Sequence, residues 1–178
     1  MKILCSILLA VTLALSINAQ TKTLEFLEKE NKSFKKNKCK IIYDKFKDFT
    51  VVTSSLVGTN LALSSIMATF GFDGQVLSKP IKNYVVSFTS VSLFKDTSLI
   101  FIANGERVNI GKAIAPNQPT KIMSIQDAYV QSYEFTPEQL EKFASGEKIE
   151  FQIGNTELTT QKDVSEKMKN LLSLSKLK

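Results

Sequence analysis

An Asn-Gly pair between two β-rich runs is the sequence feature that most limits how this chain can fold. The run 98–103 (SLIFIA) leads into Asn104-Gly105, and the run 106–110 (ERVNI) follows it. Asn and Gly accept the two positive φ angles of a type I′ turn, whose twist matches that of paired antiparallel strands. We therefore expect an antiparallel hairpin here. Because the first run is almost continuously apolar, it also predicts cover on both faces of that strand, by a second sheet or a helix.

Other runs of β-branched or alternating residues predict further antiparallel strands. The stretch 63–70 fits a helical stripe as well as a strand, and we favour the strand. Pro116 and Pro119 indicate a loop before the next strand. The strands expected in addition to the hairpin are 49–57, 63–70, 83–93, 122–135, 149–153 and 156–160, of which the last two form a second hairpin.

Two helices are expected in the last third of the chain. Thr136 followed by Pro137 and Gln139 forms a capping box with proline at the first helical position, which predicts a short helix over 137–145. A C-terminal amphipathic helix should pack on the sheet through Val164, Met168, Leu171 and Leu172.

Near the start, a short amphipathic helix over 23–30 is expected, followed by a polar connector over 31–38. These elements together predict the α+β class. We expect a mainly antiparallel sheet or sandwich, with a short capped helix near 137–145 and a C-terminal amphipathic helix.

The first nineteen residues have the layout of a cleavable signal peptide. Lys2 supplies a positive charge, 3–17 is an apolar run, and Ala19 is a small residue at the expected cut. The run of about fifteen residues is shorter than the ~20 needed by a membrane-spanning helix. We expect a secreted or periplasmic protein that begins near residue 20, and an uncleaved N-terminal anchor is the alternative.

Cysteine and histidine usage excludes several chemistries. Cleavage would leave Cys39 without an intramolecular disulfide partner, and the chain contains no histidine. Histidine triads, thiol–imidazole pairs and imidazole metal sites are therefore impossible. Glycine-rich phosphate loops and EF-hand loops are absent from the sequence as well. We expect no cofactor, no metal site and an inert Cys39.

Positive charge is concentrated near the N-terminus. Residues 22–47 hold nine lysines against four acids, and the charges of the chain after residue 47 balance. We divide the chain into a signal peptide (1–19), a basic N-terminal segment (20–47) and a single β-rich domain (48–178). An exported chain rarely meets nucleic acid, so an anionic membrane or polysaccharide surface is the better functional partner for the basic segment. The alternative is a solvated tether whose aromatic side chains join the core. The candidate surface contacts are Lys32, Lys35, Lys36, Lys38 and Lys40.

Arg107 and three pairs of acids are the remaining candidate site residues. Arg107 is the single arginine among 22 lysines, and its planar fork suits a carboxylate or phosphate, although an exposed hairpin position explains it equally well. Two acids a few ångströms apart suffice for glycosidase-type hydrolysis. Placement toward solvent or at a helix start is the ordinary explanation of each pair. The pairs are Asp44 with Asp48, Glu138 with Glu141, and Glu150 with Glu157.

The sequence contains no convincing catalytic set. We expect a secreted or envelope-associated, non-catalytic domain that binds an unidentified protein or envelope component, or that contributes to an envelope assembly. The first alternative is a module that associates with a membrane or polysaccharide surface through residues 22–47. The second is a carboxylate-based hydrolase.

Overall fold

A six-stranded antiparallel sheet forms the body of the protein, with strand order β2-β3-β4-β6-β10-β9. The structure is a computed structural model that describes residues 21–122, 126–146, 149–159 and 163–177, apart from residues 61–62. The strands of this large sheet are β2 (Lys40–Asp44), β3 (Phe49–Asn60), β4 (Leu63–Asp73), β6 (Tyr84–Ser90), β9 (Ala115–Ile122) and β10 (Gln126–Phe135).

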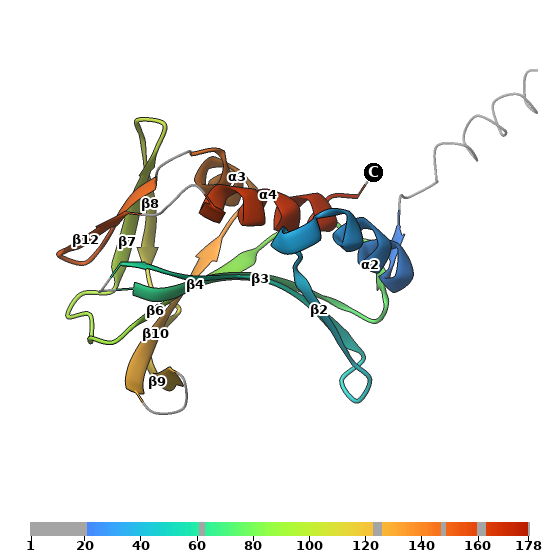
Figure 1. Cartoon of the computed structure of the whole chain (residues 1–178), viewed down its shortest axis with the longest axis horizontal. Helices are drawn as coiled ribbons and strands as arrows, with labels where there is room; N and C mark the ends of the chain where they lie inside the picture. The colour runs from blue at the N-terminus through green and yellow to red at the C-terminus, as the bar shows by residue number, and fades with distance from the viewer. Residues whose placement is uncertain (1–20, 61–62, 123–125, 147–148, 160–162, 178) are drawn as a thin grey trace, which may run out of the picture.

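A smaller, four-stranded antiparallel sheet packs against one end of the large sheet (Figure 1). The inward side chains of the two sheets meet in ring contacts. The ring centroids of Phe88 and Phe151 lie 5.1 Å apart, and those of Phe101 and Phe135 lie 5.9 Å apart. The small sheet has the order β12-β11-β7-β8 and comprises β7 (Ser98–Ala103), β8 (Glu106–Lys112), β11 (Ile149–Ile153) and β12 (Thr156–Thr159).

The helices cover the remaining part of the same face of the large sheet (Figure 1). Tyr84 Oη on β6 lies 2.6 Å from Ser175 Oγ at the end of α4, and Ser54 Oγ on β3 donates to the carbonyl of Lys167 at 3.2 Å. No helix in the described ranges is long and apolar enough to cross a membrane. The helices are α2 (Leu24–Ser33), α3 (Pro137–Ser145) and α4 (Asp163–Ser175), with a 3₁₀ turn η1 (Lys35–Asn37) and a two-stranded sheet of β1 (Lys22–Thr23) and β5 (Val76–Leu77).

The expected α+β class is confirmed, and so are its best-defined turns. Asn104 and Gly105 have φ angles of 53° and 80°, as a type I′ turn requires. The ambiguous stretch from residue 63 is strand β4. The capping box of α3 is formed, because Thr136 Oγ1 accepts from Gln139 N and Gln139 Oε1 accepts from Thr136 N. The four apolar side chains expected on the inner face of the C-terminal helix are buried: Val164, Met168, Leu171 and Leu172.

The predicted loop at Pro116 and Pro119 is wrong, because both prolines lie within β9. β9 is an edge strand that pairs with β10 on one side only, so a residue without an N–H group need not interrupt the ladder. Pro119 stands opposite Tyr129 in this pairing. The prolines also protect the open edge against pairing with another chain.

The predicted polar connector over 31–38 is also wrong. Helix α2 continues to Ser33, and η1 follows it. The Asn31 side chain forms two hydrogen bonds with the backbone of Cys39. Its Nδ2 donates to Cys39 O, and its Oδ1 accepts from Cys39 N, each at 2.8 Å. This double contact orders the segment locally and leads it into β2, a strand that the sequence did not predict.

Residues 22–47 are packed into the same body as the strands that follow them. β2 pairs with β3 in the large sheet, and β1 pairs with β5. Leu27 on α2 is fully buried in the hydrophobic core that the two sheets and the helices share. The expected signal peptide, residues 1–19, lies outside the described residues.

Strand β7 is covered on one face, whereas its sequence predicted cover on both. Leu99, Phe101 and Ala103 point inward and are buried. Ile100 is half-buried and Ile102 is 38% exposed on the opposite face, which nothing in the described residues covers. The prediction is wrong because the large sheet shields only one side of β7. The uncovered side is where the candidate site lies.

Candidate functional site

The outer face of the small sheet carries two rows of side chains set by the strand register. Residues directly opposite each other on paired strands project to the same side of a sheet. The first row contains Thr159, Glu150, Ile102 and Arg107; the second contains Glu157, Gln152, Ile100 and Asn109. Each row thus has a charged or polar residue on the outer strands and an isoleucine on β7.

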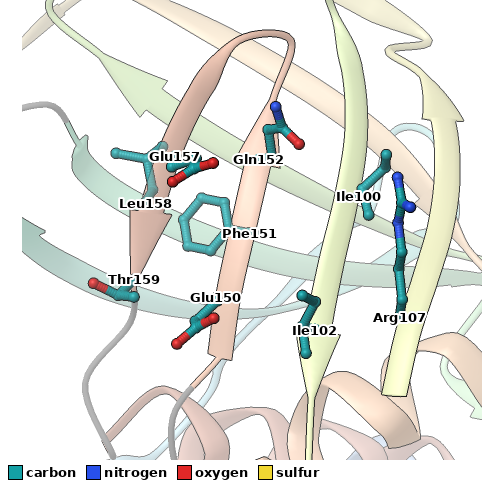
Figure 2. A pocket seen from close by; sticks show the side chains of 9 residues that line it. All are labelled: Ile100, Ile102, Arg107, Glu150, Phe151, Gln152, Glu157, Leu158 and Thr159. Atoms are coloured by element: carbon teal, nitrogen blue, oxygen red, sulfur yellow. The ribbon is translucent and has the colours of Figure 1, made fainter. Parts of the chain in front are cut away.

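Seven of these eight residues, together with Phe151 and Leu158, line an open pocket of about 680 Å³, shown in Figure 2. A pocket of this size falls within the range of small-ligand sites, roughly 300–1,000 Å³. Arg107 lies to one side of β7 in Figure 2, and the two glutamates lie to the other. The lining residues are Ile100, Ile102, Arg107, Glu150, Phe151, Gln152, Glu157, Leu158 and Thr159.

Opposite charges stand at the two sides of this pocket. Arg107 is on β8, Glu150 on β11 and Glu157 on β12, so two or three strand spacings separate the arginine from the acids. At about 4.8 Å per spacing, their backbones lie about 10–14 Å apart. Within the described part of the chain, neither Arg107 nor Glu157 forms an ion pair or a side-chain hydrogen bond.

Contacts at both ends of the small sheet hold the pocket in shape. At the β7–β8 turn, Asn104 Nδ2 donates to Ser145 Oγ on α3 at 3.1 Å, and Lys142 pairs with Glu106. At the β11–β12 turn, Gly154 N donates to Ser98 O at 2.8 Å. A Cβ atom at Gly154 would lie 2.6 Å from Asp96 O, so glycine permits this close approach. The pocket is therefore a preformed feature of the fold.

The other two carboxylate pairs have structural contacts and lie away from the pocket. Asp44 Oδ1 accepts from the backbone N–H groups of Phe46 and Lys47, at 3.0 and 3.3 Å. Asp48 accepts from Tyr43 Oη at 2.8 Å. These contacts shape the turn between β2 and β3.

On α3, the two acids are also accounted for by local structure. A backbone N–H bond at the helix start and the Thr136 side chain lower the pKa of Glu138, whereas a general acid needs a raised pKa. Glu141 pairs with Lys176 at 2.6 Å. Glu150 and Glu157 are thus the one predicted pair that lines a pocket.

The five lysines predicted as surface contacts follow one another along α2, η1 and the start of β2. All five are exposed, and none forms an ion pair with another described residue: Lys32, Lys35, Lys36, Lys38 and Lys40. At the far end of β2, Phe46 is 90% exposed at a turn that projects away from the helices (Figure 1).

Cys39 is buried beside β3, and its burial raises the pKa of the thiol to about 11. A thiol with this pKa is almost entirely protonated at neutral pH and is a poor nucleophile. Across the described ranges, no three His, Cys, Asp or Glu residues are grouped as metal ligands would be.

The sequence did not single out the central residues of the pocket, Ile100, Ile102 and Gln152. The charged residues that stand beside them on the neighbouring strands would have indicated their exposure to water. Ile102 stands between Arg107 and Glu150 on the neighbouring strands, and flanking charges indicate a face in contact with water. Arg107 and the two glutamates are more than forty residues apart in the sequence, and the fold brings them to one face.

Comparison with known proteins identifies no relative: no family model, curated protein or solved structure matches the chain. Functional inference therefore rests on the chemistry of the pocket. Arg107 supplies a fork for an anion, the glutamates attract a cation, and the isoleucines supply apolar contact. This set is suited to holding a ligand.

Proposed function

We propose that this protein is an exported, non-catalytic binding domain, secreted or associated with the cell envelope, whose ligand site is the pocket on the outer face of the small sheet. The observation that carries the proposal is the apolar strip of Ile100 and Ile102, which lies uncovered between Arg107 and two glutamates. Ligand pockets typically combine an apolar floor with a few charged groups that fix orientation.

Burial of this strip by a ligand would contribute favourably to the free energy of binding, because these side chains are exposed to water in the free protein. Each Å² of apolar surface removed from water contributes about 25 cal/mol. Because the turns at both ends of the sheet are held by contacts, little ordering of the protein is needed on binding. The pocket therefore combines driving force with preorganisation.

Backbone amide chemical shifts of the ¹⁵N-labelled protein beginning at residue 20 test the site. We would titrate a set of small carboxylates, amines and amino acids, and we expect shifts concentrated in 98–112 and 149–159. Ile102→Glu should abolish them. Val85→Glu is the matched control, because Val85 is also 38% exposed but lies on the outer face of the large sheet. Absence of shifts in the pocket, or equal binding by the Ile102→Glu variant, would contradict the proposal.

A second candidate function is association with an anionic surface through the basic segment. The favouring observation is the run of five exposed lysines without acidic partners in the described chain, from which β2 leads to the exposed Phe46 at its far end. A lysine near an anionic membrane contributes about 1 kcal/mol of attraction. Phe46 would add apolar contact at the interface.

Sedimentation with vesicles that contain phosphatidylglycerol tests this candidate. Changing Lys32, Lys35, Lys36 and Lys38 together to Gln should reduce partitioning by about tenfold or more. The matched control changes four exposed lysines elsewhere to Gln and alters the net charge equally: Lys79, Lys82, Lys95 and Lys112. Equal losses in the two variants would show that net charge alone acts and would remove the basic segment as a specific surface.

A further inference from the structure

We infer that the ligand of the pocket is an elongated dipolar molecule, with a cationic group and a carboxylate about 10 Å apart on an aliphatic body. This inference rests on the proposed binding function and names the ligand class of that same site. It follows from three parts of the pocket, which attract different chemistry. A short peptide with a basic side chain near its free C-terminus, or an ω-amino acid, has this form.

The cationic group belongs at the glutamates. Glu150 stands opposite Thr159, and Glu157 stands opposite Gln152, so the two glutamates occupy diagonal positions on neighbouring strands. Diagonal neighbours on one face of an antiparallel pair have Cα atoms about 7–8 Å apart, which allows one ammonium group to lie between the two carboxylates. Glu157 forms no ion pair within the described chain, so its negative charge favours a cation on this side of the pocket.

The carboxylate belongs at Arg107. In Figure 2 the Arg107 side chain extends along β8, and its guanidinium lies beside Ile100. The acid next to it in sequence, Glu106, is already paired with Lys142. The guanidinium therefore keeps its donors for a ligand, and its fork matches a carboxylate with two parallel hydrogen bonds.

The body of the ligand lies across β7. Ile100 and Ile102 lie on the same face of the strand, about 6.8 Å apart along it, and form the floor between the charged sides. A purely apolar ligand would remove water from Arg107 and Glu157 without replacing its hydrogen bonds, which is costly. A small polar ligand would leave the isoleucines uncovered. A dipolar chain satisfies all three parts.

Matched probes separate these contributions. 8-Aminooctanoate spans about 10 Å from nitrogen to carboxyl carbon, since an extended chain advances about 3.8 Å per three bonds. Octylamine and octanoate each lack one charged end, and β-alanine has both ends but lacks the span. We expect 8-aminooctanoate to bind about tenfold or more tightly than each of the other three, measured as dissociation constants from the same amide shifts.

Two variants test which charged end of the ligand binds on each side of the pocket. Arg107→Gln should lower the affinity for 8-aminooctanoate to that for octylamine and leave octylamine binding unchanged. Glu157→Gln should weaken the binding of 8-aminooctanoate and octylamine but leave octanoate binding unchanged. Both residues are exposed, and the amide spectrum of each variant verifies that the fold is retained.

The outcomes distinguish the ligand class from the proposed function. If octylamine or octanoate binds in the pocket as tightly as 8-aminooctanoate, the dipolar class is wrong and the binding site stands. If β-alanine binds equally, the 10 Å span is wrong. If no compound of the full set shifts the pocket amides, the proposed function fails and the ligand class fails with it.

Discussion

Lys22 joins the beginning of the described chain to its end through a buried cluster. Its Nζ donates to Glu30 Oε2 at 2.9 Å and to the carbonyl oxygens of Ser173 and Leu174 at 2.8 and 3.3 Å. The side chains of Lys22 and Glu30 are only 3% and 14% exposed. The two carbonyls belong to the last turn of α4, where carbonyl groups lack partners within the helix. One ammonium group therefore caps a helix and neutralises a buried carboxylate.

We expect Lys22→Ala to lower the free energy of unfolding by about 3 kcal/mol. Removing one partner of a buried ion pair costs about 3–5 kcal/mol, because the remaining charge is poorly solvated. Glu30 retains some exposure and a hydrogen bond from Ser173 Oγ at 3.1 Å, which places the loss at the lower end. A loss of this size is a large part of the roughly 5–15 kcal/mol that stabilises a typical domain.

Urea unfolding followed by tyrosine fluorescence measures the effect, since the chain has no tryptophan. Lys29→Ala is the matched control, because Lys29 is an exposed lysine on the same helix and should change stability by less than about 0.5 kcal/mol. The double variant Lys22→Met, Glu30→Gln should be more stable than Lys22→Met alone, because it leaves no unpaired charge. A Lys22→Ala loss no larger than that of the control would refute the reasoning.

Three further predictions concern the sheet, a helix cap and pH. A Cβ atom at Gly71 would lie 2.5 Å from Phe49 Cζ, so Gly71→Ala should destabilise the protein by about 1–3 kcal/mol in thermal melts, and most of this loss should disappear in a Phe49→Ala background. Thr136→Ala should cost about 1 kcal/mol in urea unfolding by removing the cap of α3, whereas Thr136→Ser should cost much less. Burial raises the pKa of the Cys39 thiol from 9.0 to about 11, so the unfolded chain loses this proton at a lower pH than the folded chain. Stability from this group is complete well below pH 9 and is lost as the pH rises from about 9 toward 11. The loss should reach about 2 kcal/mol by pH 10.5, and Cys39→Ala should remove that part of the decrease in urea midpoints.

The parts of the fold that sequence predicted well depend on local chemistry. Asn104-Gly105 can form its turn with few alternatives, and Thr136 with Gln139 satisfies helix-start groups within four residues. The strand assignment of residues 63–70 was correct for a related reason. Its serines and threonines form hydroxyl contacts with neighbouring strands, such as Ser65 Oγ to Thr89 Oγ1 at 3.1 Å.

The incorrect parts depend on where a segment lies in the sheet. Pro119 is compatible with β9 because that strand is at an edge, and edge position is decided by the pairing of distant segments. β2 was missed because it is short and begins with Lys40, so its five residues show little alternation. Its order comes from pairing with β3 and from the contacts of Asn31, which no local pattern reveals.

The cover of β7 at the candidate site also depends on its position in the sheet. Burial on both faces was inferred from the hydrophobicity of β7 alone, but its outward isoleucines stand beside Arg107, Glu150 and Gln152 on the neighbouring strands. A packed element could cover that face only by also removing those charged groups from water, at a cost that its own sequence would have to offset. A ligand with matching charges meets this condition without any further element of the chain. The conflict between an apolar strand and its charged neighbours is therefore the physical reason to place the binding function on this face.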